Sequence, residues 1–138
     1  MAQFFLTHSV QSVDFICMNL TMLGVIINDQ LTVSDHVTEL LSSCSRLLYA
    51  HRVLKARGLP QQSLQDKFRA TVEAKLIYAV PAWSGFCSAG DRVCLNAFLC
   101  RCIKLGYRDR SALNIDNLFT DCVLVSQRLI EEAQKSWF

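Results

Sequence analysis

The side-chain patterns of two common kinds of catalytic site are missing from this sequence. Its five glycines stand singly, and no G-x-x-x-x-G-K run is present to hold the phosphates of a nucleotide. Ser84-Gly85 lacks the G-x-S-x-G frame of a hydrolase nucleophile. The three histidines, His8, His36 and His51, are isolated from one another, which favours surface or helix-capping positions over the role of a catalytic base.

A metal centre is not expected either, because no group of ligands has the required spacing. The one adjacent acidic pair, Glu131-Glu132, falls on a predicted helix where neighbouring side chains diverge. The converging carboxylates of two-metal phosphoryl transfer are thus missing. The densest cysteine group, Cys94-x5-Cys100-x-Cys102, fits no zinc motif and is better explained by helix packing. The sequence therefore predicts no catalytic residue, no metal and no cofactor.

Cysteine is frequent, but its pattern is not that of a secreted protein. The seven cysteines, an odd number, are Cys17, Cys44, Cys87, Cys94, Cys100, Cys102 and Cys122. Met1 is followed by Ala-Gln-Phe-Phe, which has neither the basic segment nor the cleavage site of a secretory signal. We therefore expect reduced thiols and an intracellular location, cytoplasmic or nuclear.

Positive charge is absent from the first third of the chain and concentrated in the middle. Residues 1–45 carry no lysine or arginine, whereas residues 46–110 carry twelve cations and only four acidic residues. This basic middle indicates a surface that faces a polyanion, with Trp83, Phe86 and Tyr107 stacking or packing nearby. On composition alone, solvated cations around a helical bundle with these aromatics in its core are the favoured explanation.

Apolar residues are abundant for a single domain of 138 residues. Hydrophobic types make up 51% and charged types 19%, so part of the apolar surface is expected to face a partner or missing sequence. The apolar stretch Val10 to Ile27 approaches the length of a membrane span, but Asp14 lies inside it. A buried strand is therefore favoured over a membrane helix, and a membrane-anchored protein is kept as a third hypothesis.

Hydrophobic periodicity predicts two short strands, at 12–18 and 22–27, followed by about four helices. The helices are expected at 35–57, 61–79, 90–106 and 117–136. Ser34 is expected to cap the first helix, Pro81 to end the second before a turn at 81–86, and Ser88-x-x-Asp91 to form a capping box. The predicted fold is mainly α with a short N-terminal β element (α+β). Residues 1–30 would form the strand pair and residues 31–138 the helical domain.

Several short blocks follow one another along the chain. They are Leu23-Gly24-Val25-Ile26-Ile27, Leu31-x-x-Ser34-x-His36-Val37, Leu47-Leu48-Tyr49-Ala50-x-Arg52-Val53-Leu54, Gly58-Leu59-Pro60, Leu76-Ile77-Tyr78-Ala79-x-Pro81-Ala82-Trp83, Asp91-Arg92, Phe98-Leu99-x-Arg101 and Leu105-Gly106-Tyr107. In this order and at these spacings they resemble the region just past the catalytic centre of non-LTR (LINE-type) retrotransposon reverse transcriptases. The resemblance covers about residues 20–135. No single block is specific, but the ordered series is.

The resemblance implies the edge of a polymerase palm followed by a helical thumb that grips a template–primer duplex. The Tyr/Phe-x-Asp-Asp motif of the family should stand upstream of Leu23, where the residues present contain no Asp-Asp. It thus implies a non-catalytic fragment without fingers and most of the palm, which binds RNA or DNA duplexes weakly through phosphates. Candidate phosphate contacts are Arg52, Lys55, Arg57, Arg69, Arg101 and Lys104. Structural roles fall on Gly24, Gly58, Pro60, Tyr78, Pro81 and Trp83.

Two further expectations concern the basic helices and the aromatic block. Arg101, Lys104 and Arg108 recur at steps of three and four and should share one exposed face. Residues 78–83 should pack between the second and third helices, with a hydrogen bond from Tyr78 or Trp83 fixing the turn. The alternative function is a helical protein-interaction module whose basic face meets an acidic protein, with no nucleic-acid role.

Overall fold

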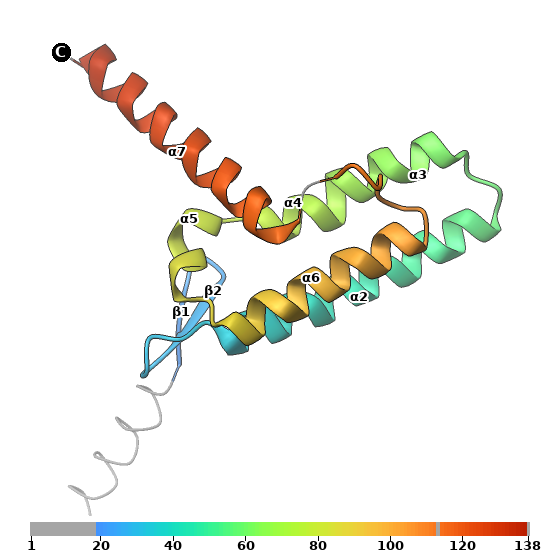
Figure 1. Cartoon of the computed structure of the whole chain (residues 1–138), viewed down its shortest axis with the longest axis horizontal. Coiled ribbons are helices and arrows are strands. Elements are labelled where there is room, and N and C mark those ends of the chain that lie inside the picture. The colour runs from blue at the N-terminus through green and yellow to red at the C-terminus, as the bar shows by residue number, and fades with distance from the viewer. Residues whose placement is uncertain (1–18, 113, 138) are drawn as a thin grey trace, which may run out of the picture.

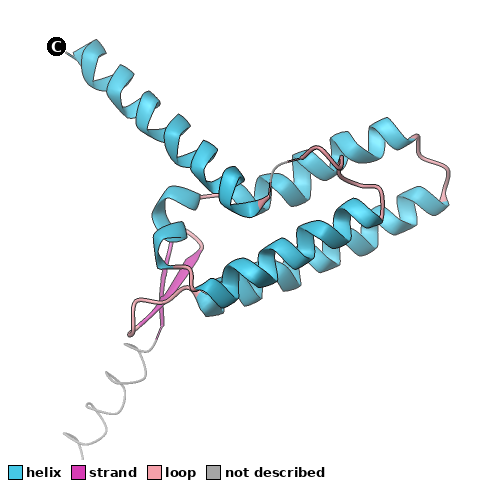
Figure 2. Ribbon diagram, in the orientation of Figure 1, coloured by secondary structure: helices cyan, strands magenta, loops and turns pink. Residues whose placement is uncertain are grey.

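The computed structural model describes residues 19–112 and 114–137 as a short β-hairpin followed by helices, which confirms the predicted fold class. The elements are β1 (Asn19–Met22), β2 (Val25–Asn28), α2 (Ser34–Ala56), α3 (Gln61–Phe68), the π-helical turn η1 (Arg69–Glu73), α4 (Ala74–Ile77), α5 (Val80–Trp83), the 3₁₀ turn η2 (Ser84–Phe86), α6 (Ala89–Lys104) and α7 (Ile115–Trp137). Figure 2 shows the hairpin beside one end of a helical body, and α7 extending away from that body.

The strand predicted at 22–27 is wrong, because the chain reverses in its middle. β1 and β2 pair antiparallel around the two-residue turn Leu23-Gly24. Both turn residues have positive φ, 51° and 80°, which matches the twist of a tight hairpin. Val25 is buried and β2 contacts α2, whereas every β1 residue is exposed. The strand predicted at 12–18 lies outside the described residues.

α2 and α6 lie side by side and run in the same direction, while α3 runs back along α2 (Figure 1). The Ser34 hydroxyl donates to the Asp91 carboxylate at 3.0 Å, which joins the starts of the two helices. Ser34 was predicted to be the cap of α2, but it is the first helical residue. Its hydroxyl does not cap its own helix because it bonds across to α6. The capping box of Ser88 and Asp91 is present as predicted. One carboxylate therefore serves the starts of both helices.

The helix predicted at 61–79 is interrupted and ends early. α3 passes into the wider turn η1, and α4 ends before Ala79, which has a positive φ of 55°. Pro81 does not end this helix. It lies in the first turn of α5. Amide hydrogens in that turn have no partner within the helix, so proline costs no helical hydrogen bond there. Residues 81–86, predicted as a turn, are therefore mostly helical.

Trp83 is fully buried and links three segments of the core. Its ring makes edge contacts with His36 of α2 and Phe119 of α7, with centroid distances of 5.1 and 5.2 Å. Its indole nitrogen donates to the Tyr78 carbonyl oxygen at 2.9 Å, which fixes the α4–α5 turn. Trp83 therefore joins α2 to α7, rather than the second and third predicted helices. The other fully buried large side chains include Leu64, Phe68, Val72, Leu76, Val80, Leu95, Leu99 and Ile115.

The two described histidines are buried, not at the surface as expected. His36 is 7% exposed and His51 is 3% exposed. The Nδ1 atom of His51 lies 2.8 Å from the Leu47 carbonyl oxygen, and its ring packs edge-on against Phe68 and Tyr107. Burial lowers the pKa of His36 from its usual 6.5. Both imidazoles thus act as small aromatic core residues.

Candidate nucleic-acid interface

α2 and α6 end in the same way and at the same end of the bundle. The glycine that follows each helix, Gly58 or Gly106, has positive φ, and its amide donates to the carbonyl three residues back. The amide of the next residue donates five residues back, which completes a Schellman motif at both ends. The carbonyl ends of two parallel helices, each with partial negative charge, therefore lie next to each other.

Five of the six candidate phosphate contacts gather at these two helix ends. They are Arg52, Lys55 and Arg57 at the end of α2, and Arg101 and Lys104 at the end of α6, and together they are called the basic end. All five are exposed. Within the part of the chain that the structure describes, none of them is in an ion pair. The basic end is therefore a concentrated and accessible positive surface.

Lys55 ties the two helix ends together. Its Nζ donates to the Leu105 carbonyl oxygen at 3.2 Å and lies 5.7 Å from the centre of the Tyr107 ring. A shallow pocket of about 320 Å³ opens beside it, lined also by Arg52 and Ala56. A cation placed on helix carbonyls stabilises the fold, so part of the positive charge here has a structural role. Sequence periodicity alone gave no signal for the Lys55–Leu105 contact.

Arg69, the sixth candidate, lies apart from the basic end at the start of η1. It is near Asp109 in the loop after α6. Hydrogen bonds from the backbone and side chain of Ser111 hold the pKa of the exposed Asp109 carboxyl below its usual value, and the Arg69 charge adds to this. Arg69 therefore lies outside the basic end and has an acidic neighbour.

Arg108 was predicted to share an exposed face with Arg101 and Lys104, but it is buried. Its Nε donates to the Glu73 carboxylate of η1 at 3.0 Å, and the two side chains are only 5% and 18% exposed. The helix ends at Lys104, so the residues beyond it no longer follow the helical spacing. A buried cation needs a partner, and this pair anchors the loop after α6 to the interrupted helix.

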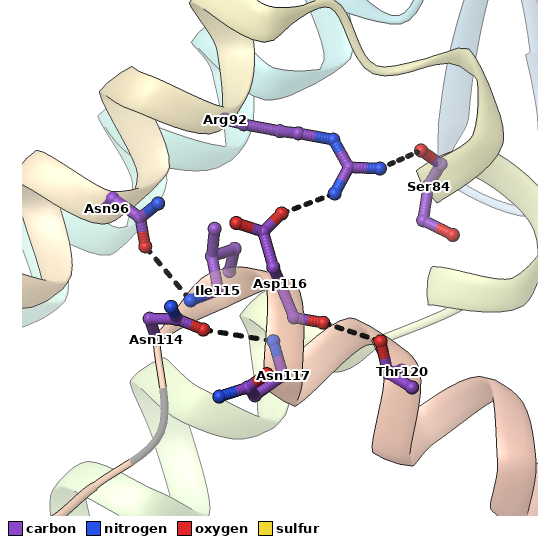
Figure 3. Close-up of polar contacts among 8 residues, drawn as sticks. All are labelled: Ser84, Arg92, Asn96, Asn114, Ile115, Asp116, Asn117 and Thr120. Atoms are coloured by element: carbon purple, nitrogen blue, oxygen red, sulfur yellow. Dashed lines mark hydrogen bonds and ion pairs between the residues drawn. The ribbon is translucent and has the colours of Figure 1, made fainter.

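The opposite end of the bundle holds a second polar cluster, which the close-up in Figure 3 shows. The guanidinium of Arg92 on α6 donates to Asp116 at the start of α7 and to the Ser84 carbonyl oxygen of η2. The Asn96 side chain accepts the amide of Ile115, the first residue of α7. These bonds join three segments of backbone, so the cluster orients α7 rather than forming a site for chemistry.

Two of the described thiols, Cys44 and Cys102, are buried in the core. Burial raises the pKa of Cys44 to about 11 and that of Cys102 to about 12, so both stay protonated near neutral pH. Cys102 packs in the core as expected, but Cys94 and Cys100 are exposed, so helix packing explains only one member of this group. Among residues 19–112 and 114–137, no three histidine, cysteine or acidic side chains are placed to hold a metal ion.

Comparison with protein-family models, curated proteins and solved structures gives no match to this chain. None of the described helices combines the length and the hydropathy needed to cross a bilayer. The functional assignment therefore depends on the residues of the chain, and the basic end is the surface on which charge and accessibility coincide.

Proposed function

We propose that this chain is a non-catalytic, thumb-like fragment of a reverse transcriptase that holds the phosphate backbone of a nucleic-acid duplex without reading its sequence. The observation that carries the proposal is the basic end, where two parallel helices bring five exposed cations together. A duplex offers a regular array of phosphates, and contacts of this kind give affinity but no sequence selectivity. The ordered blocks of the sequence supply the link to the polymerase family.

The proposal is tested by measuring the affinity of the chain for a short DNA or RNA–DNA duplex. Fluorescence anisotropy gives this affinity at several salt concentrations. Contacts to about five phosphates predict a slope near −4 in a plot of log affinity against log salt. The double variant Arg101→Gln/Lys104→Gln should reduce the magnitude of that slope by about 2. Absence of binding at low salt, or a slope near zero, would contradict the proposal.

A matched control removes two cations outside the basic end. Arg46 pairs with Glu39 on α2, and Lys75 lies on α4. Arg46→Gln/Lys75→Gln changes the net charge as much as the first double variant, but should leave the salt slope unchanged. Equal losses from both variants would mean that general charge, and not the basic end, attracts the nucleic acid.

The alternative, a basic face that meets an acidic protein, makes a different prediction. Such a face should bind linear polyphosphate as well as it binds a duplex of similar charge. A duplex-gripping surface should prefer the duplex, because its cations match a fixed spacing of phosphates. Primer extension by the purified chain with metal and nucleotides would contradict the non-catalytic part of the proposal.

The polymerase origin has a separate test in the nucleotide sequence that precedes the Met1 codon. An in-frame or decayed Tyr/Phe-x-Asp-Asp motif there would support the proposed origin. Upstream sequence without any trace of that motif would remove the family assignment, while the binding experiments above would still decide whether the basic end holds nucleic acid.

A further inference from the structure

The second half of α7 is an amphipathic helix in which every residue from 127 to 137 is exposed. Only Ile115 and Phe119 of this helix are buried. Beyond them, Leu129, Ile130 and Trp137 are 60%, 58% and 88% exposed. An isolated helix of this length is marginal in water, and a contiguous apolar stripe of this kind indicates an interaction surface. Residues 127–137 are called the α7 arm.

The two polar flanks of the α7 apolar stripe differ in charge. At about 100° per residue, Asp121, Arg128 and Lys135 recur every seven positions along one edge of the stripe, with Glu132 beside them. The opposite edge carries Gln127 and Gln134, and Glu131 lies as far from the centre of the stripe on that side as Lys135 does on the first. Charged residues beside an apolar seam decide the orientation in which two helices pair. The first edge therefore carries charges of both signs and can complement itself, whereas the second carries one acid and no cation.

We propose that the α7 arm pairs with the α7 arm of a second copy of this chain, in antiparallel orientation about a two-fold axis. Such an axis brings the charged flank against the charged flank of the second copy. With Arg128 opposite Glu132, two reciprocal ion pairs form, and Lys135 lies opposite Val125 of the facing α7, about one helical turn from its Asp121. A parallel pair would instead set this flank against Gln127, Gln134 and Glu131, where no cation is present and Asp121 and Glu132 find no opposite charge.

Charge reversal at the two paired positions tests the proposal in the full-length chain. Sedimentation should show the wild-type protein at twice the chain mass of 15.6 kDa at high concentration. Arg128→Glu leaves only acidic charge at the two paired positions, and Glu132→Arg leaves only basic charge. Each variant alone should shift toward the mass of one chain, because like charges then face each other across the axis.

An equimolar mixture of the two variants is the decisive sample. Each ion pair is restored between different chains, so the mixture should recover the doubled mass as a one-to-one heterodimer. Within either variant the residues at 128 and 132 have the same charge, so a gain in helix stability does not explain that recovery. Arg46→Glu, a charge reversal on α2, serves as the control and should leave the doubled mass unchanged.

Two results would overturn the proposal. One is a wild-type chain that keeps the mass of a single copy at every concentration at which it stays dissolved, which is also the result expected if another macromolecule covers the arm. The other is a dimer whose mass responds to neither single variant, since its interface would then lie elsewhere. Neither result bears on the basic end, which lies on the other helices.

Discussion

The bundle around α2 and α6 and the arm of α7 have similar sequence patterns and opposite surroundings. Both show apolar residues at three- and four-residue steps. On α2 the stripe that includes Val37, Leu40 and Leu48 is buried, whereas on α7 Leu129 and Ile130 face solvent. Periodicity therefore identifies a helix and the face it needs to cover, but does not say whether its own chain supplies the cover.

The sharpest test of this contrast is one substitution made in both regions. Leu95 on α6 is fully buried, and Leu129 on the arm is 60% exposed. Leu95→Ala should lower the free energy of unfolding by about 2–5 kcal/mol, because it leaves a cavity in the core. Leu129→Ala should cost less than about 1 kcal/mol in dilute protein, where the arms are unpaired. Urea denaturation measures both, and equal losses would mean that the arm packs on its own bundle.

Ion pairs offer a second comparison of buried and exposed sites. Glu73→Gln leaves the buried Arg108 without its charge partner and should cost about 2 kcal/mol, below the range for fully buried pairs because Glu73 keeps some exposure. Glu39→Gln breaks the exposed pair with Arg46 and should cost less than about 0.5 kcal/mol. A negligible effect of Glu73→Gln on the urea midpoint would show that the Arg108 contact does not anchor the loop.

The smallest expected effect is a pH dependence from the buried His36. Burial lowers its pKa in the folded chain below the usual 6.5, so the unfolded chain binds this proton more readily. The contribution is fully present above about pH 7 and is lost as pH falls below 6.5, with a slope under about 1.4 kcal/mol per pH unit. Unfolding at several pH values should show this slope, and His36→Phe should reduce it. An unchanged slope in the variant would assign the effect to other groups.

The parts of the fold that depend on local sequence signals were predictable. The mainly helical class, the long helices and the Ser88–Asp91 capping box all follow from periodicity and cap residues. The hairpin was missed because its turn is Leu23-Gly24, and leucine is an unusual residue at a positive φ, where asparagine or aspartate is common. The histidines were misplaced because their burial depends on aromatic partners that are distant in sequence.

The π-helical turn left a signal that strict counting would have found. The buried residues Leu64, Phe68, Val72 and Leu76 recur at intervals of four rather than 3.6. A continuous α-helix would carry such a series around its axis by about 40° at each step. The wider turn at Arg69–Glu73 takes up part of that drift and keeps these side chains on the core.

The candidate site was predictable as a set of residues but not as an arrangement. Charge counting located the cations between residues 46 and 110. The shared direction of α2 and α6 depends on the contacts of Ser34 with Asp91 and of Lys55 with Leu105, which join residues 57 and 50 positions apart. For the same reason, Arg69, which is exposed but lies apart, and Arg108, which is buried, were grouped with the cations of the basic end.

The parallel course of α2 and α6 has a consequence for how the chain reaches its native state. Two antiparallel helices can close from a tight turn, but these two meet only after residues 57–88 have folded back across the bundle. Closure of so long a loop loses chain entropy before any contact between the helices compensates for it. Docking of α6 on α2 is therefore the expected rate-limiting event, and residues of that contact should control the refolding rate more strongly than residues of the hairpin.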